Sequence, residues 1–219
     1  MAQKTELKSL GYEIFIAVLS VISIFNLIVN LFVKDPDLYN VFIIMNSIYS
    51  IIFLGDFTYR LLTAPSKSNY FFRQFGWADL LASLPFEQTK ILRVFRLVRV
   101  YRLMRKVGPK TILDTLVKDR AGSALIVLLL MGFFVLEFGS FAILKAEQGN
   151  PDANIKNASD AIWYTMVTIS TVGYGDRFPT TDWGRIIGGL IIIVGVGIFG
   201  TFTGYLANLF LSPQKKEDA

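Results

Sequence analysis

The chain has 219 residues, of which 53% are hydrophobic and only 18% are charged. This composition is too apolar for a typical soluble domain and indicates several membrane spans. The absence of Cys excludes disulfides and thiolate metal sites, and the absence of His removes the commonest metal ligand and the usual proton shuttle.

Apolar runs divide the chain into six expected membrane crossings and one short re-entrant helix. The crossings are expected at 12–33, 38–62, 76–84, 89–106, 122–144 and 183–211. The first run is too long for a signal-peptide core and lacks a small-residue cleavage site, so it is expected to remain as a span. The short helix is expected at 158–170, with Ser159 or Asp160 as its N-cap.

The fold class expected is therefore an all-α membrane protein with six transmembrane helices. Breaks between the runs predict its domains: an N-terminal segment at 1–10, a four-helix domain at 11–106, a connector at 107–120, a two-helix domain with the re-entrant segment at 121–211, and a tail at 212–219.

Lysines and arginines near span ends set the orientation of a membrane protein. On the side of the two termini lie Lys4, Lys8, Arg60, Lys67, Arg73, Lys106, Lys110, Lys118, Arg120, Lys215 and Lys216. The opposite loops are expected to hold Asp35, Asp37, Glu87, Glu147 and Asp152. We therefore expect a multi-pass protein of the cell membrane with both termini in the cytoplasm.

The fourth apolar run carries an arginine at every third position: Arg93, Arg96, Arg99, Arg102 and Arg105. Such a stripe spirals around an α-helix by about 60° per step, whereas 3₁₀ winding would align it. The helix could lie on the membrane surface or bind a cytoplasmic partner, but both would favour mixed spacing. Asp56 and Asp79 lie within neighbouring spans, where charged groups usually pair and serve a function. Moving one charge across a membrane potential of 100 mV changes the free energy by about 2.3 kcal/mol, so several arginines can couple voltage to pore opening. The five arginines are therefore predicted to be gating charges.

Residues Thr171-Val172-Gly173-Tyr174-Gly175-Asp176 are typical of the selectivity filter of a potassium channel. Rings of backbone carbonyls can replace the water around a potassium ion when several copies of one loop meet on an axis. Aiming successive carbonyls inward requires backbone angles that favour glycine, as at 173 and 175. A Gly-rich turn between two helices is the alternative. The short helix before the motif and the long apolar helix after it favour a filter loop that lines a watery path.

In this interpretation potassium ions are held by oxygens of Thr171, Val172, Gly173 and Tyr174, the Thr171 hydroxyl included. The side chains of Val172 and Tyr174 would point away from the axis. The chain holds one copy of the motif, and a closed ring needs several, so we expect a homotetramer.

From residue 12 to residue 210 the chain resembles the six-transmembrane voltage-gated potassium channels in a compact prokaryotic form. The stretch at 91–102, Ile-Leu-Arg-Val-Phe-Arg-Leu-Val-Arg-Val-Tyr-Arg, is similar to the sensor helix of that family. Phe53-Leu54-Gly55-Asp56, with Arg60 four residues on, resembles the family's charge-transfer centre. The resemblance implies Phe53 as the aromatic cap and Asp56 and Asp79 as the acids that receive passing arginines.

The resemblance also implies roles in the second half of the chain. Ala161-Ile162-Trp163-Tyr164 is similar to the aromatic cuff that braces the filter, and Trp163 is expected to donate a hydrogen bond to Asp176. Gly195 lies where such channels often have an inner-helix hinge. The alternative is close helix packing, in which Gly195 joins Gly188, Gly189, Gly197, Gly200 and Gly204.

Three features depart from the family. The last span lacks a Pro-X-Pro bend, so the gate is expected to differ from that of the animal channels. Asn46 stands where the second span often has an outer acid. Val167 replaces an acid that some simple potassium channels place behind the filter.

The expected function is a potassium-selective channel opened by depolarisation, with a voltage-sensor domain and a pore domain. In one alternative the arginine helix is static and lipid, ligand or pH gates the pore. Another alternative, a subunit of a potassium uptake transporter, would normally carry four diverged filter repeats. No enzymatic activity is expected, and no cofactor apart from the permeant potassium ion. The expected partners are copies of the chain and membrane lipids, with neither nucleic acid nor a small-molecule substrate.

Overall fold

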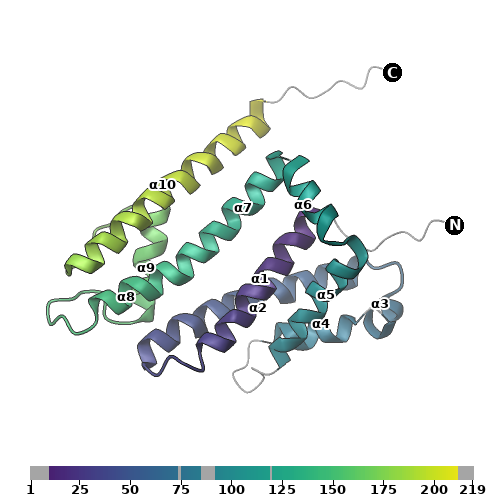
Figure 1. The fold of residues 1–219 in the computed structure, drawn as a ribbon, viewed down its shortest axis with the longest axis horizontal. Coiled ribbons are helices and arrows are strands. Elements are labelled where there is room, and N and C mark those ends of the chain that lie inside the picture. Colours follow the sequence, from purple (N-terminus) through teal and green to yellow (C-terminus); the bar gives the residue numbers. More distant parts are fainter. Residues whose placement is uncertain (1–9, 74, 85–91, 119, 212–219) are drawn as a thin grey trace. The chain divides into compact units, whose positions relative to one another are not determined.

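The computed structural model describes residues 10–73, 75–84, 92–118 and 120–211, and within them it contains helices and connecting turns. The chain divides into two compact units, Met1–Ser123 and Ala124–Ala219 (Figure 1). The expectation of an all-helical fold is confirmed for the described residues. The N-terminal segment before residue 10, the tail at 212–219 and the loop residue Glu87 lie outside them, as do Lys4, Lys8, Lys215 and Lys216.

The first unit consists of α1 (Leu10–Val29), α2 (Pro36–Thr63), α3 (Lys67–Arg73), α4 (Gly76–Ser83), α5 (Arg96–Val107) and α6 (Pro109–Lys118). A charged turn separates α1 from α2 because the Asp35 carboxylate caps α2, accepting from the backbone N–H groups of Asp37 and Leu38 at 3.0 Å each. Proline at the first helical position needs no hydrogen-bond partner for its nitrogen.

Two helix pairs form the centre of this unit, with α4 against α2 and α5 against α1. Ile14 and Ala17 of α1 pack on Leu103 of α5, and these three side chains are buried. The 3₁₀ turn at 92–95 precedes α5. The arginine stripe is therefore mostly α-helical and spirals, apart from this short segment.

The second unit contains a long helix, a short helix and a second long helix: α7 (Arg120–Phe134) continues through the π-helical turn η2 (Val135–Gly139) into α8 (Ser140–Glu147), followed by α9 (Ala158–Ile169) and α10 (Asp182–Leu211). Figure 1 shows α9 beside α8 and α10, and it contacts both. Its N-cap is Asn157, whose side-chain oxygen accepts from the Asp160 N–H at 3.0 Å. The prediction of Ser159 or Asp160 as N-cap is therefore wrong.

Within the described residues, four helices are long and apolar enough to cross a membrane: Leu10–Val29, Pro36–Thr63, Ala124–Glu147 and Asp182–Asn208. The predicted third and fourth crossings are shorter. Eight residues of α4 extend about 12 Å and twelve of α5 about 18 Å, whereas the hydrocarbon core is about 30 Å thick. The start of the fourth crossing at 89–91 lies outside the described residues. The protein is a multi-pass membrane protein, and six crossings remain a prediction.

Candidate functional site

The two acids predicted in the first unit lie against the predicted arginines. The Arg99 guanidinium is 2.9 Å from Asp56 Oδ2 and 3.3 Å from Asp79 Oδ1, so it bridges α2 and α4. Arg102 Nη2 donates to Asp79 Oδ2 at 2.6 Å. Both carboxylates are almost fully buried. Buried ions of this kind require close counterions, and the arginines supply them.

Phe53 of α2 lies beside two successive arginines. Its ring centroid is 4.5 Å from Cζ of Arg96 and 5.1 Å from Cζ of Arg99, and the side chain is fully buried. Cations within about 6 Å of an aromatic face are attracted by the ring quadrupole. The ring therefore contacts both Arg99, which pairs with the acids, and Arg96, which does not.

Arg96 is held by neutral oxygens. Its Nε donates to the carbonyl of Ala82 at 3.0 Å and its Nη2 to Ser50 Oγ at 3.0 Å, and its Nη1 contacts Ser23 Oγ. Within the described residues no carboxylate pairs with it. The arginines thus lie in two kinds of surroundings. Arg99 and Arg102 contact the acids, and Arg96 contacts neutral oxygens.

The five arginines differ in environment. Arg93, Arg96 and Arg99 are buried, Arg102 is partly exposed, and Arg105 is exposed. This gradient follows from the spiral of an α-helical stripe and from the position of the residues along α5.

Two further ion-pair partners were not among the predicted site residues. Arg60 pairs with both carboxylate oxygens of Glu13 at 2.9 Å, and its Nε donates to Asp56 Oδ1 at 2.8 Å. The Tyr12 hydroxyl also donates to Asp56 Oδ1, at 2.5 Å. The sequence feature that could have indicated this pair is Glu13 itself, a lone acid at the start of an apolar run.

The second acid also has a tyrosine partner. The Tyr70 hydroxyl of α3 donates to Asp79 Oδ2 at 3.0 Å. Burial, together with the nearby Asp79 carboxylate, raises the pKa of Tyr70 above its ordinary value. The hydroxyl thus remains protonated and keeps its hydrogen bond to the acid.

In the second unit, the loop after α9 has the irregular backbone expected of the predicted filter. Thr171, Gly173 and Gly175 have positive φ angles of 59°, 60° and 76°. The N–H groups of Val172 and Gly173 both donate to the carbonyl of Val167, at 3.1 and 3.3 Å. Positive φ costs glycine nothing sterically, whereas at Thr171 it is strained. Along the loop, residues with positive φ at 171, 173 and 175 alternate with residues that lack it at 172 and 174.

Aromatic residues flank this loop. Trp163 Nε1 donates to Asp176 Oδ2 at 2.8 Å, which is the expected hydrogen bond. The rings of Trp163 and Tyr174 stack at 5.9 Å with an interplanar angle of 5°. Tyr164 is buried, and its hydroxyl packs against Gly188 of α10. A Cβ atom added at Gly188 would lie only 2.6 Å from this hydroxyl oxygen. Trp163 of α9 therefore contacts the loop, and Tyr164 of α9 contacts α10.

The loop itself is exposed within a single chain. Val172, at 53% exposed, and Tyr174, at 68% exposed, are the two side chains expected to point away from the axis. Large apolar side chains on α10 are also exposed, among them Ile186, Leu190 and Ile193.

Glu147 was expected in a loop, and that expectation is wrong. It ends α8 and is buried, and its carboxylate accepts from the backbone N–H groups of Thr180 and Thr181 at 2.9 Å each. The Thr181 hydroxyl donates at 2.7 Å, and the Thr180 hydroxyl makes a fourth contact. This residue therefore fixes the chain between the predicted filter and α10.

Gly195 makes a close helix contact. A Cβ atom there would lie 2.7 Å from Cα of Ile169, at the end of α9. At Gly189, Gly197, Gly200 and Gly204 an added Cβ would meet nothing within 4 Å in the described chain. Close packing against Ile169 therefore explains why residue 195 is a glycine, and its role as a hinge stays a prediction.

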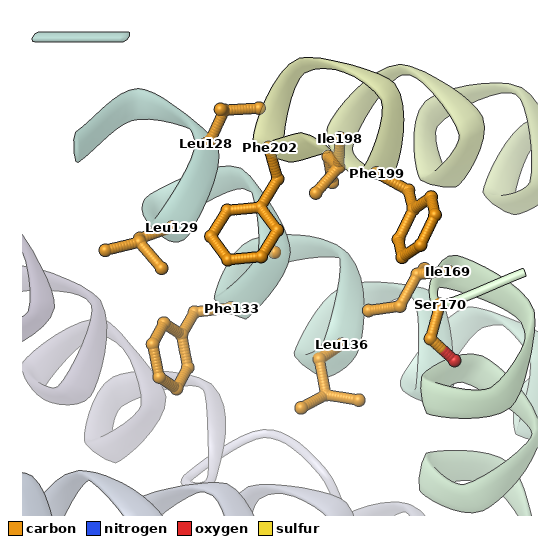
Figure 2. A pocket seen from close by; sticks show the side chains of 10 residues that line it. Leu128, Leu129, Phe133, Leu136, Ile169, Ser170, Ile198, Phe199 and Phe202 are labelled. Carbon is orange, nitrogen blue, oxygen red and sulfur yellow. The ribbon is translucent and has the colours of Figure 1, made fainter. Parts of the chain in front are cut away.

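An apolar cavity of about 320 Å³ lies within this unit. Figure 2 shows side chains from α7, η2, the end of α9 and α10 around it, and the lining residues are Leu128, Leu129, Gly132, Phe133, Leu136, Ile169, Ser170, Ile198, Phe199 and Phe202. The one hydroxyl in the lining, that of Ser170, already donates to the carbonyl of Val167 at 3.2 Å. The cavity is suited to apolar groups.

The model of the ion transport protein family matches residues 9–218. The chain is 38% identical over 73 residues to a voltage-gated potassium channel of Aeropyrum pernix, covering 33% of this chain and 25% of that one. It is 35% identical over 96 residues to the calcium-gated potassium channel TvoK of Thermoplasma volcanium, covering 42% and 28%.

A more distant relative is the voltage-gated potassium channel regulatory subunit KCNF1 of Rattus norvegicus, 25% identical over 166 residues, covering 66% of this chain and 33% of that one. The matched segments thus span about a quarter to a third of these relatives. Since the family model covers nearly the whole chain, the protein belongs to the ion transport protein family and is similar, over part of its length, to prokaryotic voltage-gated potassium channels.

Proposed function

We propose that the protein is a potassium-selective channel opened by membrane depolarisation. The observation that carries the voltage-gating part is the seating of Arg99 on Asp56 and Asp79 beside the buried Phe53 ring. Potassium selectivity is supported by the backbone of the loop at 171–175 and by the names of the relatives. Carbonyls of Thr171, Val172, Gly173 and Tyr174 would hold the ions.

The functional unit is a homotetramer in the cell membrane. One chain supplies one filter loop, and a ring of carbonyls needs several. The exposure of Val172, Tyr174 and the apolar residues of α10 supports this assembly, because a single chain leaves them uncovered. Both termini would be cytoplasmic, with the filter opening to the outside and α9 acting as a re-entrant pore helix.

Residues 11–106 form the voltage sensor and residues 121–211 the pore, joined by the connector at 107–120. In this proposal α4 and α5 belong to the third and fourth of six crossings. A short α4 is compatible with such a sensor because its one acid, Asp79, is held against α3 and α5 rather than against lipid.

Gating follows from the charge on α5. An inside-negative potential would draw the arginines inward, and depolarisation would let them move outward. Each charge that crosses the full potential contributes about 2.3 kcal/mol per 100 mV, so a few charges in each of four subunits suffice for steep opening. The neutral oxygens around Arg96 and the acids around Arg99 supply hydrogen-bond acceptors along the path.

A static arginine helix is the second candidate, with the pore gated by lipid, ligand or pH. The observation that favours it is the density of fixed contacts at Asp56, which pairs with Arg99 and Arg60 and accepts from Tyr12. A network of buried ion pairs can serve to hold four helices together without moving.

Neutralising arginines distinguishes these two candidates. In voltage-clamp recordings Arg96→Gln and Arg99→Gln should make the conductance–voltage relation shallower or shift it, because fewer charges cross the field. Arg73→Gln, at an exposed position on α3, serves as control and should leave the relation unchanged. Because removal of Arg99 leaves two buried acids without a partner, Arg99→Lys keeps the charge and should retain the slope. Unchanged voltage dependence in both neutral variants would refute a moving sensor.

A further inference from the structure

The apolar cavity of the second unit lies along one end of its first membrane-spanning helix. The lining residues that come from α7 and η2 run from Leu128 to Leu136 (Figure 2). The candidate span that contains them begins at Ala124. At 1.5 Å per residue, this part of the lining lies about 6–18 Å from that end of the span.

The lining residues of α10 lie at a matching depth. They occupy positions 198–202, about 9–15 Å from the end of the last span at Asn208. The chain reverses between α8 and α10, where Glu147 binds the N–H groups of Thr180 and Thr181, so Ala124 and Asn208 belong to the same end of the unit. Since the hydrocarbon core is about 30 Å thick, the cavity lies in the half of the core next to that end.

The chemistry of the lining excludes water as a stable occupant. Leucine, isoleucine, phenylalanine and glycine make up the lining apart from Ser170, whose hydroxyl already donates to the carbonyl of Val167. A buried water needs two or more polar partners, and cavities of about 150 Å³ lined by Leu, Ile and Phe stay dry but bind benzene. This cavity has about 320 Å³. Its walls lose dispersion contacts unless apolar atoms fill it.

A phospholipid tail is the apolar group available at this depth. Lining residues on both long helices reach the surface of the unit: Leu129 is 42% exposed, Phe199 45% and Phe202 39%. The tails of one leaflet extend from the interface into the hydrocarbon core and therefore pass the level of the cavity. The lining offers no charged group that would hold a headgroup, so the tail alone would enter.

We propose that this cavity is a lipid site that binds one acyl chain of a membrane phospholipid. The inference goes beyond the proposed function and depends neither on potassium selectivity nor on voltage sensing. The bound tail contacts Ile169 and Ser170, the last two residues before the loop that begins at Thr171. It thus supports the end of α9 from the side opposite to the loop's aromatic neighbours on the sequence, through packing rather than hydrogen bonds.

The first experiment uses the unmodified full chain, reconstituted with a phospholipid that carries bromine on one acyl chain. Its structure in this lipid should show bromine density inside the cavity, next to Leu136 and Phe199. A side chain from a second copy of the protein in the same space would overturn the proposal, as would a cavity without bromine. Mass spectrometry of the protein should find the brominated phospholipid bound, and a free fatty acid in its place would overturn the assignment to a phospholipid.

Gly132 is the position at which the site can be blocked. It lines the cavity, and a Cβ atom added there meets nothing within 4 Å, so Gly132→Phe has room to fill the space. This variant should lose the bound lipid and the part of the Tm that depends on it. That part is about 5–10 °C at a lipid concentration about a hundredfold above Kd. If Gly132→Phe does not fold, Gly132→Leu serves in its place.

Met131→Phe is the matched control. Met131 is the preceding residue of α7, is 42% exposed and does not line the cavity, so the same ring is added outside the site. This variant should keep the lipid and its effect on Tm. Equal lipid binding in both variants, or an equal loss in both, would overturn the proposal. A channel that shows no preference for potassium would contradict the proposed function but would leave the lipid site in place.

Discussion

Glu147 should be essential for the stability of the second unit, and Glu147→Gln tests this. The carboxylate receives one backbone N–H and one hydroxyl on each oxygen, from Thr181 on Oε1 and from Thr180 on Oε2. A glutamine amide must place its NH₂ group against one of these pairs. The hydroxyl can rotate and accept, but the backbone N–H cannot, so it loses its acceptor in a buried site.

The magnitude follows from the bonds that are lost. Hydrogen bonds to charged groups contribute about 1.5–3 kcal/mol each, and the substitution removes one completely and weakens the others. We therefore expect a loss of about 3 kcal/mol in the free energy of unfolding. For a chain of this length each kcal/mol lowers Tm by about 2–4 °C, so Tm should fall by about 6–12 °C.

The assay is thermal unfolding of the purified channel in one detergent and lipid mixture, followed by tryptophan fluorescence. Asp152→Asn is the control, since it removes an acid from the exposed loop that follows α8. Its Tm should match that of the unmodified protein. An unchanged Tm in Glu147→Gln, or an equal fall in the control, would show that the carboxylate does not fix this segment.

Two further substitutions test the second unit. Gly195→Ala should destabilise the protein by about 1–3 kcal/mol, because its Cβ would lie 2.7 Å from Cα of Ile169. Gly189→Ala is the control and should not destabilise the protein, because an added Cβ there meets nothing within 4 Å in the chain. Equal Tm values for the two variants would contradict this expectation. Trp163→Phe keeps an aromatic ring but removes the 2.8 Å hydrogen bond to Asp176, so potassium current should decay faster at constant voltage, and an unchanged decay would show that the bond does not support the filter.

Local sequence patterns predicted much of this molecule. Long apolar runs gave four of the expected membrane helices, since each needs only its own composition to be identified. The acids at 56 and 79 were detectable because a carboxylate within an apolar run requires a nearby cation, and the arginine stripe supplied it. The positive φ angles at Gly173 and Gly175 follow from the residue type itself.

Contacts between distant residues were not predictable in the same way. Glu147 stood at the end of an apolar run and was assigned to a loop, because its partners at 180 and 181 are more than thirty residues away in the chain. The pair of Glu13 and Arg60 was missed for the same reason, because its members are 47 positions apart in the chain. For Gly195, sequence does not distinguish a flexible position from one where a neighbouring backbone leaves no room for a side chain.

Helix ends were uncertain for a related reason. The helix was expected at 158–170 and α9 begins at Ala158, but the cap is Asn157 rather than Ser159 or Asp160, and its side chain accepts from the Asp160 N–H. Asn, Ser and Asp side chains can all cap a helix, so their chemistry alone does not identify the cap. The expected third crossing has a related problem, since its apolar run of nine residues is too short to cross the hydrocarbon core and forms the short, partly buried helix α4.

The most direct test of the central claim is current through the purified protein in a planar bilayer, with potassium on one side and sodium on the other, under voltage steps. We predict a reversal potential close to that of potassium and opening that rises steeply with depolarisation. Potassium selectivity with voltage-independent opening would contradict the moving sensor. A reversal potential that shows no preference for potassium would contradict the assignment of residues 171–176 as a selectivity filter.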